Sequence, residues 1–396
     1  MLENLNAIPV DPLLKIIGEY AADERSDKID LGVGVYKNAD GQTTVMKAVK
    51  RAEQNLVDEQ FSKSYIGLAG DMGFVEEIRK LTFGDIARGQ NRLMGLQTPG
   101  GSGALRLAGD LIKKSNPAAK IWIGLPCWSN HIHIFKMAGL KIETYNRYDS
   151  ETSSIAFDTI VSSLSAANHG DIILLQGCCD NPTGADFSLN QWKTLAGLCN
   201  QFGLIPLVDL AYQGLGQGLT QDVAGLTTIL DQIPEALITV SCSKNFGLYR
   251  ERTGALFVLA SDNAQSKIVR SNLFSLARAG YSMPPDHGAV VVRLILRNPE
   301  TKEIWVSELD DMRERIITMR HSLAAHLEKL DGSFKFIRCQ KGMFSLLPLR
   351  SDQIEHLRVE YGGFVTLTAM APIFPNRLLR RIQRPSRYSI RSELGI

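Results

Sequence analysis

Short apolar runs alternate with helical stretches along the middle of this sequence, and the alternation limits the folds open to the chain. The runs read KIWIGLP (120–126), DIILLQG (171–177), GLIPLVDL (203–210), ALITVSC (236–242) and GALFVLA (254–260). Helical patterns such as LNQWKTLAGLCNQFG (189–203) separate most of them. Nearly continuous apolar strands that alternate with helices are typical of a mostly parallel sheet covered on both faces. The sequence therefore predicts the α/β fold class.

The length and charge of the chain limit its domain organisation and the kinds of partner it can bind. A chain of 396 residues is longer than one hydrophobic core usually supports, so we expect one large and one smaller domain. The formal net charge is only +2, which gives no reason to expect nucleic acid or a membrane surface as a partner. No stretch approaches the roughly 18 uncharged apolar residues that cross a bilayer, so no membrane span is predicted.

The N-terminus and the cysteines indicate the cellular compartment. The first residues, MLENLNAIPVDPLLKIIGEY, lack the uninterrupted apolar core of a signal peptide. No two cysteines have the CxxC spacing of a metal site, and adjacent Cys178 and Cys179 suit buried reduced thiols better than a disulfide framework. The six cysteines are Cys127, Cys178, Cys179, Cys199, Cys242 and Cys339. We therefore expect a cytoplasmic protein without a bound metal.

Polar side chains follow the predicted strands at the edge where parallel sheets bind ligands. Asp209 and Tyr212 come at the end of one apolar run, and Ser241 and Lys244 at the end of another. A lysine after a strand is ordinarily part of a solvated loop. The alternative is a nucleophilic amine, beside which hydroxyls and the guanidinium of Arg252 hold an anion. The clustering of polar residues at strand ends favours the second interpretation of Lys244.

Three further segments have both a structural and a functional interpretation. The Gly-Gly-Ser-Gly turn at 100–103 opens a helical stretch whose backbone amides suit a phosphate, although such turns are common and this one is neither a Walker nor a dinucleotide motif. Trp128 lies beyond a strand, where its ring either joins the core or stacks on a flat ligand. Asn181 precedes a proline, which forms an ordinary turn but also keeps Asn181 extended and aims its amide.

Together these residues require a ligand with an anionic group, a planar ring, a basic ring nitrogen and a carbonyl that reacts with an amine. Pyridoxal phosphate has all four features. Lys244 would form the Schiff base, and Asp209 would keep the ring nitrogen protonated so that the ring can accept electrons. Without such a ligand, Asp209 would be a helix cap or a member of a structural ion pair. The phosphate would be bound by Ser241, Arg252 and the amides of Gly101 and Ser102.

A series of motifs carries a resemblance to a known family. In order they are DLGVGVYK, SYIGLAG, TPGGSGAL, NPTG, DLAYQG, SKNFGLYRER, YSMPPDHGA and KGMFSLLPL, and the match extends from about residue 1 to about residue 362. The chain resembles the class I aminotransferases of fold type I, in the branch of aspartate and aromatic-amino-acid aminotransferases. The resemblance implies a large domain at 44–311 with a mostly parallel seven-stranded sheet between helices. It also implies a smaller α+β domain made of 1–43 and 312–396.

The resemblance implies a role for each matching position around the cofactor. Lys244 resembles the lysine that carries the cofactor and moves the proton between the substrate Cα and the cofactor C4′. Tyr212 and Asn181 would hydrogen-bond the 3-hydroxyl oxygen of the ring and help to set the imine pKa. Trp128 would stack on the ring, and His131 would orient the carboxylate that faces the ring nitrogen.

Other matching positions imply contacts with the substrate and with a second subunit. Tyr65 matches the tyrosine that reaches the phosphate across a dimer interface. Gly34 matches the glycine whose backbone touches the substrate, and Trp128 and Asn181 would line the same substrate site. Arg278 matches the arginine that the partner subunit lends to grip a side-chain carboxylate. Composite sites of this kind imply a homodimer.

Three features depart from the family pattern. Asp180 stands where a histidine often precedes Asn-Pro-Thr-Gly, and it adds a negative charge near the site. Met283 stands where aspartate-specific members tend to carry asparagine, which makes the end of the pocket beside Arg278 less polar and more adaptable. The family arginine that grips the substrate α-carboxylate would fall on Met370.

The position of Met370 belongs to the tail from Phe364, and this tail as a whole is the third and largest departure. It contains six arginines and three prolines, with Glu393 as its single acid. We hypothesise that a frameshift, in the gene or in its sequencing, replaced roughly the last 32 residues. The alternative is a genuine divergent tail in which Arg377, Arg380 or Arg381 takes over the carboxylate contact.

The predicted activity is reversible transamination of tyrosine, phenylalanine, aspartate and glutamate with 2-oxoglutarate or oxaloacetate. Ser102 is smaller than the threonine of many aspartate-specific relatives, and with Met283 it leaves room for an aromatic ring. One alternative is a strict aspartate aminotransferase. Another is a pyridoxal-phosphate-binding protein whose activity is impaired because the α-carboxylate arginine is missing. Elimination or decarboxylation fits less well, because a site that pairs with both substrate carboxylates favours loss and return of a proton.

Overall fold

The computed structural model describes residues 2–7, 12–32, 34–84, 91–329 and 332–364. Its centre is a seven-stranded sheet with the strand order β2-β10-β9-β8-β7-β3-β4. β10 runs antiparallel to β2 and β9, and the other neighbouring strands are parallel. The strands are β2 (Leu93–Pro99), β3 (Lys120–Leu125), β4 (Lys141–Asn146), β7 (Ile172–Gln176), β8 (Ile205–Leu210), β9 (Ala236–Ser241) and β10 (Thr253–Leu259). The predicted mostly parallel sheet is confirmed.

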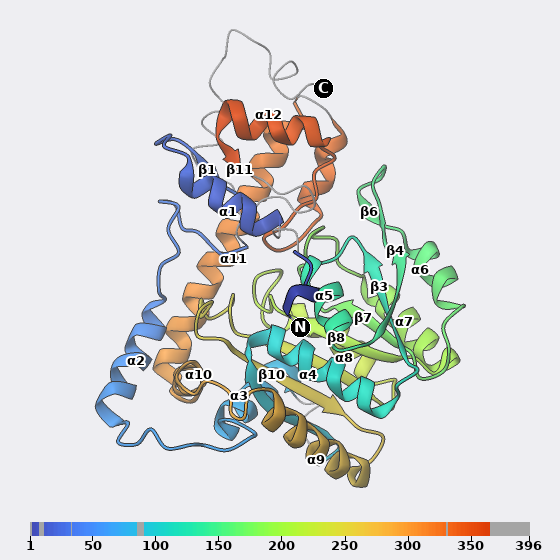
Figure 1. The fold of residues 1–396 in the computed structure, drawn as a ribbon. Coiled ribbons are helices and arrows are strands. Elements are labelled where there is room, and N and C mark those ends of the chain that lie inside the picture. Colours follow the sequence, from blue (N-terminus) through green and yellow to red (C-terminus); the bar gives the residue numbers. More distant parts are fainter. Residues whose placement is uncertain (1, 8–11, 33, 85–90, 330–331, 365–396) are drawn as a thin grey trace.

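Helices cover both faces of the sheet (Figure 1). Ile172 and Leu174 of β7 belong to one hydrophobic cluster with residues of α4, α5 and α9, whereas Ile173 and Leu175 belong to another with residues of α7, α8, α10 and α11. Side chains alternate between the two faces of a strand, so β7 is buried on both sides. This explains why residues 172–175 of β7 are all apolar, rather than every second one.

Twelve α-helices and several short elements complete the described part of the chain. The α-helices are α1 (Pro12–Ala22), α2 (Lys47–Glu59), α3 (Met72–Phe83), α4 (Gly100–Ser115), α5 (Ser129–Met137), α6 (Phe157–Leu164), α7 (Leu189–Phe202), α8 (Ala224–Leu230), α9 (Asn263–Gly280), α10 (His287–Arg297), α11 (Pro299–Leu327) and α12 (Ser351–Tyr361). The short elements are η1 (Leu2–Asn4), η3 (Gln221–Val223), η4 (Gly332–Arg338), β1 (Ile29–Asp30), β5 (Tyr148–Asp149), β6 (Ser154–Ile155) and β11 (Gly363–Phe364).

The ends of α7 show how local sequence sets an element that covers the sheet. The Ser188 hydroxyl accepts a hydrogen bond from the Gln191 backbone N–H (3.2 Å), and the Gln191 side chain accepts one from the Ser188 N–H (2.8 Å). This capping box satisfies two backbone donors that the first turn leaves unpaired. Gly203 ends the helix at φ +66°, a left-handed conformation that favours glycine.

A third hydrophobic cluster lies away from the sheet. It includes Ile29 of β1, Phe334 of η4 and Ile354 of α12, together with the last turns of α11. α11 is 29 residues long and joins this cluster to the sheet, where Trp305 and Leu309 pack in the core (Figure 1). Parallel pairing of β1 with β11 brings the N-terminal and C-terminal parts of the described chain together.

The predicted division into domains at 44–311 and at 1–43 with 312–396 stays a prediction. Of the tail that departs from the family, only Phe364 belongs to the described residues, and Met370 and the tail arginines lie outside them. Among the helices that the structure describes, none combines the length and the apolar character needed to cross a bilayer.

Candidate active site

A cavity of about 200 Å³ lies at the carboxyl ends of the central strands. The register of the sheet places Gln176, Asp209 and Thr239 side by side on β7, β8 and β9. Ten of the predicted site residues line the cavity: Gly34, Gly101, Ser102, Trp128, Asn181, Asp209, Tyr212, Ser241, Lys244 and Arg252. The structure therefore brings together residues that are up to 218 positions apart, from Gly34 to Arg252.

Lys244 lies in the turn that follows β9. Its Nζ lies 5.0 Å from the centre of the Tyr212 ring. Burial lowers the pKa of the Lys244 amine to about 8, an effect that Asp209 opposes and Arg252 reinforces. Only a neutral amine attacks a carbonyl, so a lowered pKa makes Lys244 a competent nucleophile near neutral pH.

The long helix α11 fixes the turn that carries Lys244. The indole Nε1 of Trp305 donates a hydrogen bond to the backbone carbonyl of Asn245 (2.8 Å). The ring of Phe246 stacks on Trp305, with ring centres 4.5 Å apart and an angle of 4° between the planes. The residues directly after Lys244 are thereby held by both a hydrogen bond and an aromatic stack.

Asp209 is a buried carboxylate with two hydrogen-bonding neighbours. Thr239 donates its hydroxyl to Oδ1 (2.7 Å), and His131 Nε2 lies 3.0 Å from Oδ2. His131 is buried, and its ring meets Trp128 edge-on with the centres 5.1 Å apart. The contact predicted between His131 and Asp209 is thus present. It fixes the carboxylate at the cavity wall, where a charged group needs partners to offset its burial.

Tyr212 and Asn181 form a hydrogen-bonded couple at the other side of the cavity. Asn181 Nδ2 donates to Tyr212 Oη (3.3 Å). Burial raises the pKa of the Tyr212 hydroxyl, so this group stays protonated. Phe344 packs edge-on against the Tyr212 ring at 5.7 Å, and a Cβ at Gly34 would lie 3.2 Å from the Phe344 ring. Gly34 therefore approaches the cavity over Phe344.

The start of α4 forms a cradle suited to an anion. A Cβ at Gly101 would lie 3.0 Å from the Ser241 Cβ, and one at Gly100 would lie 2.7 Å from Nη2 of Arg252. Gly100 has φ +69°, which glycine adopts without strain. A hydroxyl, a guanidinium and the amino end of a 16-residue helix thus converge, and the helix dipole favours negative charge there.

Two predicted site residues do not line the cavity of this chain. Tyr65 has 91% of its surface exposed, and Arg278 is exposed in the last turn of α9. The segments that carry them lie together, because the Ile66 backbone N–H donates to Sδ of Met283 (3.2 Å). Both residues therefore belong to one exposed region of the chain.

Several residues at the site were not foreseen. Thr239, which contacts Asp209, was missed because the two residues are 30 positions apart in sequence and only the pairing of β8 with β9 brings them together. The one available signal was a polar residue inside the apolar run 236–240. Gln176 and Tyr249 also line the cavity. Asp180 was expected to add a charge near the site, but it is buried and forms an ion pair with Arg147. This charge is neutralised within the protein.

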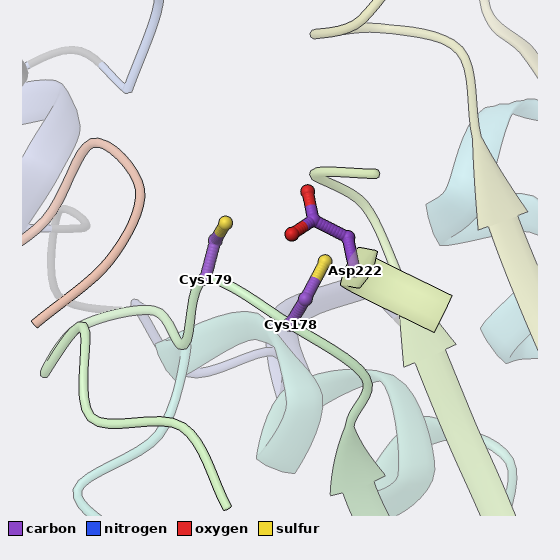
Figure 2. Close-up of side chains that lie close together, drawn as sticks. All are labelled: Cys178, Cys179 and Asp222. Carbon is purple, nitrogen blue, oxygen red and sulfur yellow. The ribbon is translucent and has the colours of Figure 1, made fainter. Parts of the chain in front are cut away.

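Cys178, Cys179 and Asp222 come close together (Figure 2). Both Asp222 oxygens are already used, because they accept the backbone N–H groups of Gly214, Gly216 and Gln217 at 2.7–2.9 Å. Hydrogen bonding to Cys179 and burial raise the pKa of the Cys178 thiol, which disfavours the thiolate that a metal needs. The cluster therefore fastens the loop after Tyr212, and the cysteines are free thiols.

Pyridoxal phosphate fits the chemistry of this site. The amino end of α4 with Ser241 and Arg252 suits its phosphate, and the buried carboxylate of Asp209 suits its protonated ring nitrogen. A reactive amine, Lys244, faces the same cavity. A helix-covered, mostly parallel sheet with these groups at its carboxyl edge is that of a pyridoxal-phosphate enzyme of the α/β class.

The particular family follows from comparison with known proteins. The chain belongs to the class I and II aminotransferases, whose sequence model matches residues 26–375. A tyrosine aminotransferase of Rhizobium meliloti (strain 1021) is 52% identical over 355 residues, covering 90% of this chain and 91% of that protein. An aspartate aminotransferase of Escherichia coli (strain K12) is 42% identical, covering 94% and 96%.

A solved structure agrees with this assignment. The aromatic-amino-acid aminotransferase from Burkholderia pseudomallei, covalently bound to pyridoxal phosphate, matches with a TM-score of 0.93 at 34% identity and covers 96% of each chain. The family, the fold type, the aminotransferase activity and pyridoxal phosphate as the cofactor, all predicted from sequence, are confirmed.

Proposed function

We propose that this aminotransferase acts on both aromatic and dicarboxylic amino acids and carries its cofactor on Lys244. The observation that supports the proposal most is the Lys244 amine, whose pKa is lowered to about 8, in one cavity with Asp209 and the anion cradle. Bound pyridoxal phosphate supplies an aldehyde that condenses with amines and a ring that withdraws electrons from the substrate Cα.

Residues of the chain control the protonation of the cofactor ring and move the proton of the substrate. Asp209, held by Thr239 and His131, keeps the ring nitrogen protonated. With the cofactor bound, the amine of Lys244 would be the base that moves the proton between the substrate Cα and the cofactor C4′. Asn181 and Tyr212 donate hydrogen bonds to the 3-oxygen of the ring.

Other groups of the chain bind and orient the cofactor and the substrate. Ser241, Arg252 and the amides of Gly101 and Ser102 hold the phosphate. Trp128 stacks on the ring, and the backbone of Gly34 borders the substrate. These contacts set the orientation in which the Cα–H bond of the substrate is broken.

A homodimer would complete the active site, because Tyr65 and Arg278 do not line the cavity of their own chain. Tyr65 and Arg278 are exposed and lie in neighbouring segments, as expected of residues lent to another subunit. Apolar side chains are exposed around them, with Phe61 fully exposed and Val57 at 73%. A second copy that covers this surface would bury these side chains and receive Tyr65 and Arg278 at its own site.

The free thiols suit a reducing, cytoplasmic location.

Substrate choice follows from Arg278 and its surroundings. A guanidinium favours aspartate and glutamate through a charge-assisted, bidentate contact. The thioether of Met283 is tied to the Ile66 N–H and offers Arg278 no strong polar anchor, so Arg278 can turn toward water when a ring binds. Relatives named as tyrosine and as aspartate aminotransferases are 52% and 42% identical to this chain, which agrees with a site for both substrate types.

No residue of the described chain is assigned to the substrate α-carboxylate. Among the described residues that line the cavity, Arg252 is the one arginine, and it is assigned to the phosphate. The expected family position, Met370, and the alternatives Arg377, Arg380 and Arg381 lie outside the described residues. The frameshift hypothesis therefore stays open to test by resequencing the gene and by an intact mass.

Single-turnover absorbance tests the proposal. The purified protein is loaded with pyridoxal phosphate and mixed with tyrosine, aspartate or cysteine sulfinate. We expect the band of the lysine-bound cofactor to convert to that of the amine form with both tyrosine and aspartate. Conversion with aspartate alone would contradict the dual specificity, and a band that persists with every donor would indicate a protein that binds cofactor without turnover. The same measurement on a version with a family-like C-terminus isolates the effect of the tail.

A further inference from the structure

Arg147 and Asp180 form a buried ion pair beside the active site. Only 8% of the Arg147 side chain and 2% of the Asp180 side chain are exposed. Arg147 directly follows β4, and its guanidinium lies over the Phe187 ring, 5.4 Å from the centre. Two charges that far from water are tolerated only as partners. Asp180 directly precedes Asn181, so the ion pair lies where it can hold the turn that contains Asn181 in place.

Asp180 organises the turn that contains Asn181. Its Oδ1 accepts hydrogen bonds from Arg147 Nη1 and Gln176 Nε2, and its Oδ2 accepts from the backbone N–H and the hydroxyl of Thr183. The Gly184 N–H donates to the Asp180 carbonyl (2.7 Å), which closes the turn. Four donors saturate one carboxylate, so the turn has one favoured geometry.

Gln176 connects this pair to Asn181. Its Oε1 accepts the Asn181 N–H (3.0 Å), and its Nε2 donates to the Asn181 carbonyl (2.9 Å) as well as to Asp180. Gln176 therefore holds both the backbone N–H and the backbone carbonyl of Asn181. Its side-chain amide is left to donate to Tyr212 Oη at 3.3 Å.

From this chain of contacts we infer that Arg147 and Asp180 are positioning residues of the aminotransferase reaction. They hold Gln176 and the turn at 180–184 so that Asn181 and Tyr212 meet the 3-oxygen of the cofactor ring together. This inference rests on the proposed roles of Asn181 and Tyr212. A purely structural pair would stabilise the fold without affecting the hydrogen bonds to that oxygen, so the two cases can be separated.

The pKa of the linkage between Lys244 and the cofactor reports on those hydrogen bonds. Donors to the 3-oxygen stabilise its negative charge and weaken its hold on the linkage proton, which lowers that pKa. Loosening Asn181 and Tyr212 should therefore raise it, by about half a pH unit to one unit if one ordinary hydrogen bond is lost. The charged and titratable groups of the cavity wall, Asp209, Tyr212, Lys244, Tyr249 and Arg252, are unchanged in the variants below.

The experiment compares pH titrations of the absorbance of the loaded protein. Asp180→Asn and Arg147→Met each break the pair, and both should shift the midpoint upward. Asp171→Asn is the matched control, because Asp171 is also a buried carboxylate and accepts three hydrogen bonds, from Lys120, Asn168 and Trp122. Asp171 lies before the first residue of β7, at the end of the strand opposite to the site. This control should lower the unfolding temperature and leave the midpoint at the parental value.

Gln176→Leu keeps both charges and removes the hydrogen bonds of Gln176 to Asn181 and to Asp180. It therefore tests the inference even if a variant of the ion pair fails to fold. It should reproduce the upward shift. The double variant Arg147→Met/Asp180→Asn should lose less stability than the two single losses added together, because no unpaired charge is left inside. Parental midpoints in Asp180→Asn and Gln176→Leu would overturn the inference while leaving the proposed function intact. A parent protein that shows no titrating band on Lys244 would overturn the proposed function first.

Discussion

The protonation of Lys244 in the apoprotein is open to direct measurement by competitive acetylation. Burial, opposed by Asp209 and reinforced by Arg252, lowers its pKa from 10.5 to about 8. Because only the neutral amine reacts, and its fraction changes about tenfold per pH unit below the pKa, Lys244 should carry about 300 times more neutral amine at pH 7 than an ordinary lysine.

The assay treats the cofactor-free protein with a trace of labelled acetic anhydride between pH 6 and 11 and quantifies each lysine by peptide mass. Acetic anhydride has neither phosphate nor ring, so its reaction is independent of the cofactor contacts. Exposed Lys302 is the internal reference in the same sample. We expect the labelling of Lys244 to level off near pH 8.

Two variants that each remove one charge test the cause of the shift with opposite signs. Asp209→Asn removes the charge that stabilises the ammonium, so the midpoint of Lys244 should fall below that of the parent. Arg252→Gln removes a repelling cation, so the midpoint should rise. A Lys244 midpoint near 10.5 in the parent, or a shift of the same sign in both variants, would refute the account of the site.

Three further outcomes are expected. Lys244→Ala and Lys244→Arg should both lose covalent cofactor, since a guanidinium stays protonated, and borohydride reduction with peptide mapping of the parent should label Lys244 and no other lysine. Asp209→Ala should retain pyridoxal phosphate but lose on the order of several kcal/mol in the chemical step, measured by single-turnover kinetics, and near-parental turnover would show that the ring nitrogen needs no carboxylate. Arg278→Leu should reduce kcat/KM for aspartate by about 1.5–3 kcal/mol more than for phenylalanine, and equal losses for the two donors would argue against its role in substrate choice.

Five strands of the sheet were predictable because each is apolar at several consecutive positions. All five runs that were singled out are strands of the central sheet. Strand direction was not predictable in the same way, since an apolar run has the same pattern whether its neighbour is parallel or antiparallel. The antiparallel strand β10 therefore emerges only from the register with β2 and β9.

The residues of the cavity were predictable where polar side chains follow strands. Asp209, Ser241 and Lys244 satisfy that rule, and all three line the cavity. The partner of Asp180 was not predictable, because Arg147 is 33 positions away in sequence and no local periodicity joins the two. The prediction that Tyr65 and Arg278 complete the site of another subunit rests on family resemblance, and the exposure of both residues in the single chain supports it.

The ion pair between Arg147 and Asp180 also limits how this sequence can be recombined with its relatives. The family pattern that this sequence resembles often has a histidine at the position of Asp180. A chimera that takes only the segment 180–184 from a relative with that histidine would leave Arg147 buried without its carboxylate, a change that typically costs about 3–5 kcal/mol. The segment after β4 and the turn at 180–184 must therefore be exchanged as one unit, although they are separate in sequence. Crossover points between 147 and 180 would break that unit, whereas crossover points on either side of it would preserve it.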